Sequence, residues 1–291
     1  MPYVDTIRIN QIFVIESLRP DDKKSARDMV FDVNLEIAST PMRATFELCA
    51  GVQAFKELIH GLTVRTASDE VLPLLHIECH GHQDDGLVFS DSSTLSWPEM
   101  WDVLRPLNVV MGNRLVVVLA TCVSFGAITL VPLSSPAACY FLIAPTEKIY
   151  PDELYSAFKE FYCRLASGDA ANAMESLTIR RYQEGGMGSM AAGEWFSRLM
   201  DNYLREHGST KGLKASALRL AMLAKDDGMA NLNMRYWKSF VKNTLSQRLH
   251  QYFDVFFMLD KFPSSRVRFS KEQDKLERRL EEQGYRSASL A

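Results

Sequence analysis

The segment VLPLLHIECHG, residues 71–81, is apolar over most of its length and ends in His-Gly. A second apolar segment, RLVVVLATC at residues 114–122, ends in a cysteine. Apolar runs of this kind predict strands covered on both faces, as in a parallel sheet flanked by helices. In such sheets, ligands and reactive groups lie at the carboxyl ends of the strands, so these two ends are the first places to look for a site.

The rest of the first 170 residues alternates between strand and helix patterns. Residues 25–39 are ambiguous, because helical spacing competes with a strict alternation from Phe31 to Ile37. We expect a short helix there that runs into a strand. Further strands are predicted at 8–18, 42–51 and 138–146, and helices at 52–64 and 151–168. Residues 1–170 therefore predict an α/β layer fold with a mostly parallel sheet.

The pattern beyond residue 170 is helical. Residues 171–262 predict a helical portion packed on the core, interrupted by the glycine-rich segment EGGMGSM at 184–190. We expect that segment to be a flexible linker, or a loop that moves or is cut on activation. Residues 263–291 predict a charged helix and tail, solvated or docked on a partner, because only Leu276 and Leu280 interrupt its polar faces.

Composition excludes several classes of protein. The chain has 291 residues and a net charge of −3, so no overall positive field attracts nucleic acid or an anionic membrane. Its five cysteines are odd in number and lack the spacing of a disulfide framework, which favours reduced thiols. The N-terminus lacks the features of a signal peptide, and the apolar runs are too short to cross a bilayer. We expect a cytoplasmic protein that binds neither membrane nor nucleic acid directly.

The two strand ends carry a pair of groups suited to acyl transfer by a thiol. Cys122 would act as the nucleophile and His80 as the group that protonates a leaving amine. Gly81 permits close approach of the backbone, so the N–H groups of Gly81 and Cys122 are the expected oxyanion donors. The sequence assigns no carboxylate to orient His80.

The stretch from Leu74 to Ala127 resembles the CHAT domain of the caspase-like cysteine peptidases. The matching features are a strand ending in His80-Gly81, a hairpin at 86–91, a helix from Leu95 to Leu104 and a strand ending in Thr121-Cys122. Residues 144–177 also resemble the family. The resemblance implies a caspase-like three-layer sandwich followed by a helical C-terminal extension. It also implies that Cys122 and His80 cleave a protein substrate without a cofactor.

By resemblance, such enzymes often act in prokaryotic stress or antiviral defence and are switched on by a partner. We therefore expect an activating or inhibitory protein partner and a latent state, with loops at 84–96, 123–137 or 183–190 disordered or blocking the site. His82, Asp84, Asp85 and Asp91 are candidate substrate-binding residues, the aspartates as an acidic pocket for a basic side chain. Ordinary turn carboxylates are the alternative interpretation of these aspartates.

Other interpretations of the same residues remain open. Cys122 is either a nucleophile or an inert packed thiol, since free cysteine is among the most buried residue types. His76, Cys79, His80 and His82 resemble metal ligands, but no second pair at zinc spacing accompanies them, so no metal is expected. The main alternative function is a catalytically inactive adaptor that acts through its helical half. A Rossmann-like hydrolase or transferase of another kind is disfavoured, because ESLRPDDKKS after the first strand is not a glycine-rich phosphate loop.

Overall fold

The computed structural model divides the chain into two compact units. It describes residues 9–82, 84–122, 124–126, 132–178, 180, 182–183, 185–226, 228 and 233–285. The first unit comprises residues 1–131 and 137–192, and the second comprises 132–136 and 193–291. The first unit thus extends beyond the expected boundary at residue 170, because a helix and a strand after that residue belong to it.

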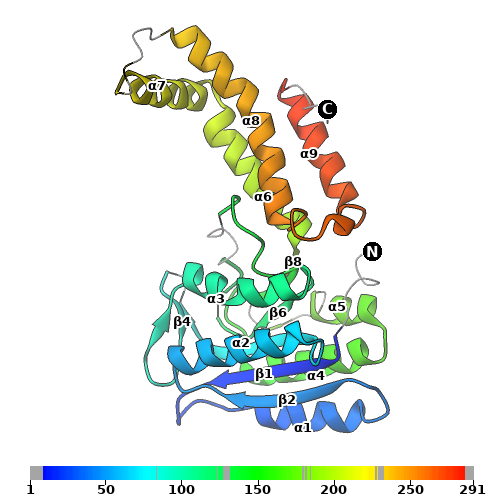
Figure 1. Ribbon diagram of the computed structural model, residues 1–291. Helices are drawn as coiled ribbons and strands as arrows, with labels where there is room; N and C mark the ends of the chain where they lie inside the picture. Colours follow the sequence, from blue (N-terminus) through cyan, green and yellow to red (C-terminus); the bar gives the residue numbers. More distant parts are fainter. Residues whose placement is uncertain are drawn as a thin grey trace. The chain divides into compact units, whose positions relative to one another are not determined.

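The first unit is built on a mixed, mostly parallel sheet (Figure 1). Its main path runs β2-β1-β3-β6-β7-β8, and only β8 on this path is antiparallel to its neighbour. A small antiparallel extension, β4 and β5, continues from the end of β3. The strands are β1 (Gln11–Ser17), β2 (Arg43–Leu48), β3 (Pro73–His82), β4 (Gly86–Val88), β5 (Thr94–Leu95), β6 (Val116–Leu119), β7 (Phe141–Pro145) and β8 (Met187–Ala191).

Helices cover both faces of this sheet, which confirms the α/β class (Figure 1). One face packs against α1 (Ala26–Glu36), α4 (Pro151–Ala166) and α5 (Ala170–Thr178), with Ile12 and Val14 in the shared core. The other face lies against α2 (Val52–Ala67) and α3 (Trp97–Val110), and Arg65 of α2 lies over the Phe13 ring. Alternate residues of β1 therefore serve two cores, which explains why its sequence is apolar on both faces.

Two segments of the first unit differ from the sequence predictions. Residues 26–36 form helix α1, and no strand follows it directly. Val33 and Ile37 are buried, whereas Phe31 and Leu35, which a strand would place on the same face, are 64% and 63% exposed. Burial in this segment therefore follows the helical spacing of three and four residues, and the prediction of a strand from the alternation of Phe31 to Ile37 is wrong. Most of the glycine-rich segment is also not a linker: Met187–Ala191 form β8, paired with β7. A Cβ on Gly188 would lie 2.7 Å from the Phe125 ring, so this glycine permits close packing.

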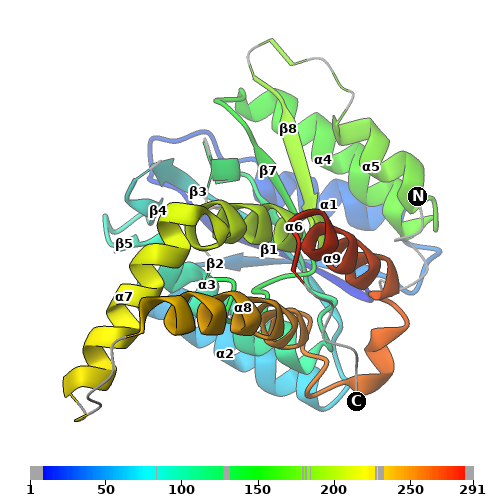
Figure 2. The ribbon, with the colours of Figure 1, turned by 90° about the horizontal axis from the view of Figure 1, so that it is seen from above.

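The second unit is helical and has its own aromatic core. Its helices are α6 (Ala192–Tyr203), a π-helical turn (Leu204–Gly208), α7 (Thr210–Asp226), α8 (Met234–Phe256) and α9 (Ser270–Glu282). Phe196 of α6 packs against Phe253 and Phe256 of α8, with ring centroids 5.3 and 5.4 Å apart. Helices α7 and α8 pack against each other at an angle (Figure 2).

The charged C-terminal helix α9 is docked within its own unit. Leu276 and Leu280 are buried, and Arg279 pairs with Asp201 of α6 at 2.9 Å. The prediction of a solvated or partner-bound tail is therefore corrected for residues 270–282, since a narrow apolar seam is enough to dock a helix when the facing surface is apolar. Across the described residues, no helix has the length and apolar character needed to cross a membrane.

Candidate active site

The carboxyl ends of β3 and β6 lie side by side, as predicted. These strands are parallel neighbours, with Ile77 opposite Leu119, and the Ala120 N–H donates to the Ile77 carbonyl at 2.8 Å. His80 lies three residues beyond Ile77 in β3, and Cys122 lies three residues beyond Leu119, in the turn that follows β6. A Cβ on Gly81 would lie 2.7 Å from the Cys122 carbonyl oxygen, closer than real Cβ contacts allow. Glycine at position 81 thus lets the two chain segments touch.

His80 has a carboxylate partner that the sequence analysis missed. The Nε2 atom of His80 lies 2.8 Å from Oδ2 of Asp22, in the loop between β1 and α1. The side chains are 43% and 27% exposed, so the pair lies at the edge of the sheet and open to solvent. With Nε2 engaged by Asp22, Nδ1 is the ring nitrogen left for proton transfer.

The same carboxylate is held in its ionised form. Burial raises the pKa of Asp22, but hydrogen bonds from the His80 ring and the Arg19 backbone N–H outweigh it and lower the pKa below its ordinary value. Its Oδ2 accepts that backbone N–H at 2.7 Å. A charged carboxylate at this position accepts a hydrogen bond from His80 and fixes the orientation of its ring.

A sequence signal for Asp22 was present. Asp21 and Asp22 come shortly after the first strand, and β1 is the parallel neighbour of β3, with Ser17 opposite Cys79. A loop that leaves the end of β1 must therefore pass near the end of β3. What the sequence did not reveal was the strand order that makes β1 and β3 neighbours.

A pair of carboxyl groups lies on the same face of the sheet as His80, one step earlier along the strands. Glu16 and Glu78 are opposite each other on β1 and β3, and the Ser25 hydroxyl donates to Glu78 at 3.2 Å. Desolvation and the charge of Glu16 raise the pKa of Glu78 to about 7, against the opposing effect of Ser25. Desolvation also raises the pKa of Glu16, in opposition to Lys24 and Arg27. The loop after β1 is thus joined to β3 twice, through Asp22–His80 and Ser25–Glu78.

The thiols differ in their surroundings. Cys79, the neighbour of His80 in sequence, is 4% exposed on the opposite face of β3, and burial raises its pKa strongly. Burial raises the pKa of Cys49 to about 11 and that of Cys139 well above its ordinary range. Cys122 and Cys163 are half-buried, and Cys163 lies on α4, where burial again raises its pKa. Of these thiols, Cys122 is the one placed beside the His-Gly strand end.

His76 is a core residue. It is 1% exposed, its Nδ1 lies 2.7 Å from the Tyr162 hydroxyl, and its ring packs on the edge of Phe158. Burial lowers the pKa of His76 to about 3, which keeps the ring neutral. Within the described residues, no three His, Cys, Asp or Glu side chains converge in a way that could hold a metal ion.

The candidate substrate-binding residues each have a local partner. Nδ1 of His82 lies 3.0 Å from Oδ2 of Asp85 and 3.4 Å from the Asp84 backbone nitrogen, so these three residues contact one another between β3 and β4. Asp91 accepts hydrogen bonds from Ser93, which lower its pKa. Asp91 belongs to a separate turn that contacts the start of α2. The structure therefore does not gather the three aspartates into one acidic pocket.

The loops expected to hold the site latent are described only in part. Residues 84–96 form the β4–β5 hairpin and the start of α3, and 187–190 belong to β8. Ser124 begins a short 3₁₀ turn after Cys122, and its hydroxyl donates to the Thr121 carbonyl at 2.8 Å. Residues 123, 127–131 and 184 lie outside the described part of the chain.

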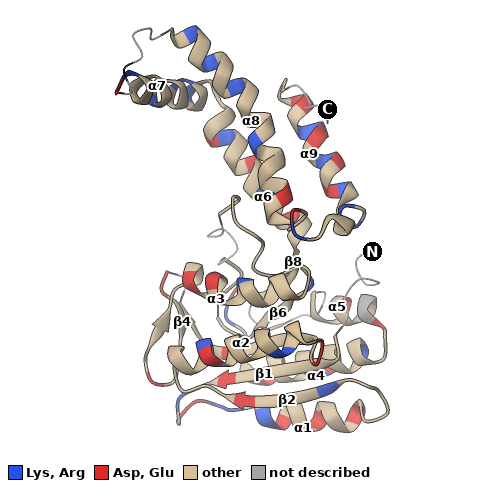
Figure 3. Cartoon of the chain, viewed as in Figure 1, with Lys and Arg blue, Asp and Glu red and all other residues tan. Residues whose placement is uncertain are grey.

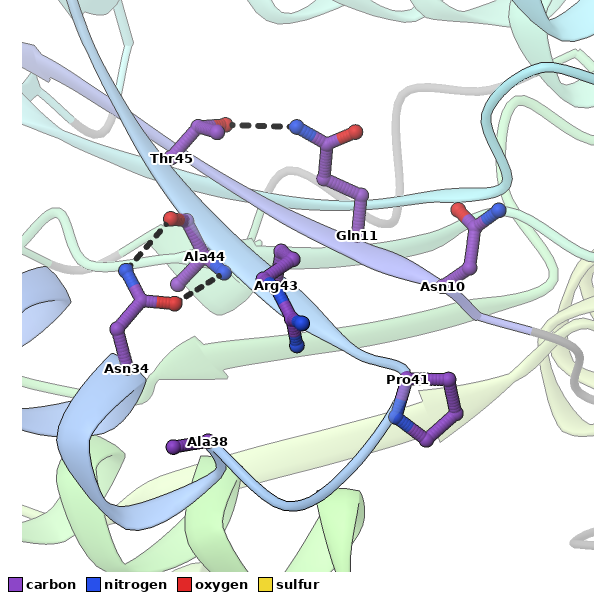
Figure 4. Close-up of a pocket in the computed structure, with 8 residues that line it drawn as sticks. All are labelled: Asn10, Gln11, Asn34, Ala38, Pro41, Arg43, Ala44 and Thr45. Carbon is purple, nitrogen blue, oxygen red and sulfur yellow. Dashed lines mark hydrogen bonds between the residues drawn. The ribbon is translucent and has the colours of Figure 1, made fainter.

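One open cavity of about 570 Å³ lies at the opposite edge of the sheet, where β1 and β2 begin (Figure 4). Its polar groups are occupied by the protein itself. Asn34 exchanges two hydrogen bonds with the Ala44 backbone, and Gln11 donates to Thr45 (Figure 4). The Arg43 guanidinium donates to two nearby carbonyls, those of Thr40 and Met42. The polar groups that line this cavity therefore stabilise the local backbone. The cavity lies at the opposite ends of the strands from His80 and Cys122.

No protein-family model matches the chain, and no functionally curated protein matches its sequence.

Proposed function

We propose that the chain is a caspase-like cysteine endopeptidase with Cys122 as nucleophile and His80 as general acid/base. The observation that carries the proposal is the convergence of three groups at one edge of the sheet. His80 lies near the end of β3, Cys122 follows the neighbouring parallel strand β6, and Asp22 holds the imidazole of His80 at 2.8 Å. The contact of Gly81 with the Cys122 carbonyl brings the two strand ends together. The caspase-like form of the sandwich is part of the same proposal.

The chemistry follows from these positions. The Cys122 thiolate attacks the scissile carbonyl, and the N–H groups of Gly81 and Cys122 stabilise the developing oxyanion. Nδ1 of His80 delivers its proton to the departing amine, while Asp22 stabilises the imidazolium and keeps the ring in place. Water, deprotonated by His80, then hydrolyses the thioester and releases the second product. The reaction needs no metal or cofactor.

A peptidase of this kind must be restrained in the cell that makes it. We propose that a protein partner switches it on, in a stress or antiviral response. Asp22 and His80 are partly exposed, and the loop of Asp22 is joined to the sheet by hydrogen bonds at Ser25 and Asp22. A partner that shifts this loop would change the orientation of His80, which is a route to regulation.

The test compares new protein N-termini in cells that produce the wild type, with its genomic neighbours, and in cells that produce Cys122→Ala. We expect termini that disappear in Cys122→Ala and remain in Cys163→Ala, which removes the other half-buried thiol. Asp22→Asn should lower kcat by about 10²-fold, the usual worth of positioned acid–base catalysis, with little change in KM. Full cleavage by Cys122→Ala would disprove the assignment.

The second candidate function is an inactive adaptor acting through the second unit. The observation in its favour is that most charged side chains on α7 and α8 are basic and exposed (Figure 3). The adaptor predicts that biological activity survives Cys122→Ala and is lost when residues 262–291 are deleted. The same pair of strains therefore separates the two functions.

A further inference from the structure

The outward face of α7 carries an apolar stripe that nothing in its own unit covers. Ala217, Ala221 and Ala224 are the buried residues of this helix. Away from this buried alanine face, Leu218 and Met222 are 51% and 60% exposed. Helical geometry puts Ala215, Leu218 and Met222 in one line, at the alternating spacing of three and four residues that packs one helix against another.

The stripe is bordered by positive charge. On a helical projection Lys214 and Lys225 lie along one side of it and Arg219 along the other, and all three are exposed. Residues 209–253 hold eight Lys and Arg against two Asp, which gives this segment +6 within a chain of net charge −3. Figure 3 shows this blue concentration on α7 and α8, whereas α9 carries both signs.

These basic groups form no ion pair in the described part of the second unit, although Arg248 donates to the Tyr203 hydroxyl and Lys242 lies over the Tyr285 ring. In the part of the chain that the structure describes, the ion pairs of this unit involve other basic groups. They are Arg198, His207, His250, Arg266 and Arg279. Lys and Arg beside an apolar seam act as the flanking charges that choose a partner helix in coiled-coil packing.

We propose that the α7 stripe binds an amphipathic helix of an acidic protein partner. The partner's apolar residues would cover Leu218 and Met222, and its Glu or Asp side chains would pair with Lys214, Arg219 and Lys225. An aliphatic seam favours a helix over single-stranded nucleic acid, because bases stack on aromatic rings and gain little from leucine or methionine. The binding site is independent of the proposed peptidase and applies equally to an adaptor.

The test uses the full chain and two designed helical peptides of about 20 residues with the same leucine seam. One peptide has Glu at the flanking positions and the other has Lys. Fluorescence anisotropy should show that the acidic peptide binds at least about tenfold more tightly, and less tightly as salt is raised. Leu218→Ser/Met222→Ser should abolish this binding, and Lys214→Glu/Arg219→Glu should transfer it to the basic peptide.

The matched control is Phe31→Ser/Leu35→Ser on α1. These two residues have the same spacing and are 64% and 63% exposed, but they lie in the first unit. This variant should bind the acidic peptide as the wild type does. Circular dichroism of each variant confirms that its helices are intact. An acidic peptide that does not bind, or binds equally well after Leu218→Ser/Met222→Ser, overturns the proposal. So does a preference for poly(dT) or phosphatidylserine vesicles that depends on the same two residues.

Discussion

Replacing Glu78 by Gln should stabilise the first unit, and the gain should depend on pH. Gln keeps the shape of the side chain and an oxygen that accepts the Ser25 hydroxyl, but it carries no charge. The pKa of Glu78 is raised from 4.5 to about 7 by desolvation and by Glu16. At about 1.4 kcal/mol per pKa unit, this corresponds to at most about 3.5 kcal/mol, reduced by the solvent that reaches this partly exposed residue.

The direction of the effect follows from proton binding. Between about pH 4.5 and 7 the folded state keeps a proton on Glu78 that the unfolded chain has released. The free energy of unfolding of the wild type therefore falls as pH rises through this range, relative to a chain without the carboxyl group. Glu78→Gln should match the wild type near pH 4.5 and exceed its stability above pH 7.

The assay is urea unfolding of both proteins from about pH 5 to about pH 8.5. Limited proteolysis with mass spectrometry of peptides from β1 and β3 reports the first unit alone, which matters because two units need not unfold together. Glu36→Gln, which removes the same charge from the exposed end of α1, is the control and should show no such trend. A stability difference that is constant with pH, or a variant less stable at pH 8.5, would refute the electrostatic argument.

Three further predictions concern packing and thiol reactivity. Gly81→Ala should destabilise the first unit by about 1–3 kcal/mol, because the added Cβ meets the Cys122 carbonyl oxygen. Gly61→Ala should instead stabilise the first unit by about 0.5–1 kcal/mol, because no atom lies near its Cβ and alanine favours helix α2. Thermal unfolding of each variant measures both effects. Iodoacetamide at neutral pH should modify Cys122 before Cys163, as followed by mass spectrometry; equal rates would argue against an activated thiol. Leu280→Ala should cost about 2–5 kcal/mol in urea unfolding of the second unit, and no loss would show that α9 is not docked.

The sequence was sufficient for features that depend on local pattern. Continuous apolar runs identified β3 and β6, and the rule for parallel sheets placed His80 and Cys122 at the same edge. The choice between two periods in residues 26–37 was beyond the sequence. Val33 and Ile37 fit both a helix and a strand, and burial decided the matter by leaving Phe31 exposed.

Position along the chain also misled the assignment of units. Residues 171–192 follow the last predicted strand of the α/β core, so the sequence pattern predicts that the helical portion begins there. The tertiary structure returns Met187–Ala191 to the sheet as an antiparallel edge strand beside β7. Gly188 is required there by the Phe125 ring, a contact between residues more than sixty positions apart that no local pattern encodes.

The sequence by itself determined the α/β class of the first unit and the two strand ends that carry a histidine and a cysteine, because hydrophobic periodicity and strand polarity are local properties. Only the tertiary structure decided that Asp22 forms a hydrogen bond with His80, 58 residues away in the sequence. That pairing depends on the order β1-β3-β6, and strand order is set by how the whole sheet and its covering helices bury their apolar faces together.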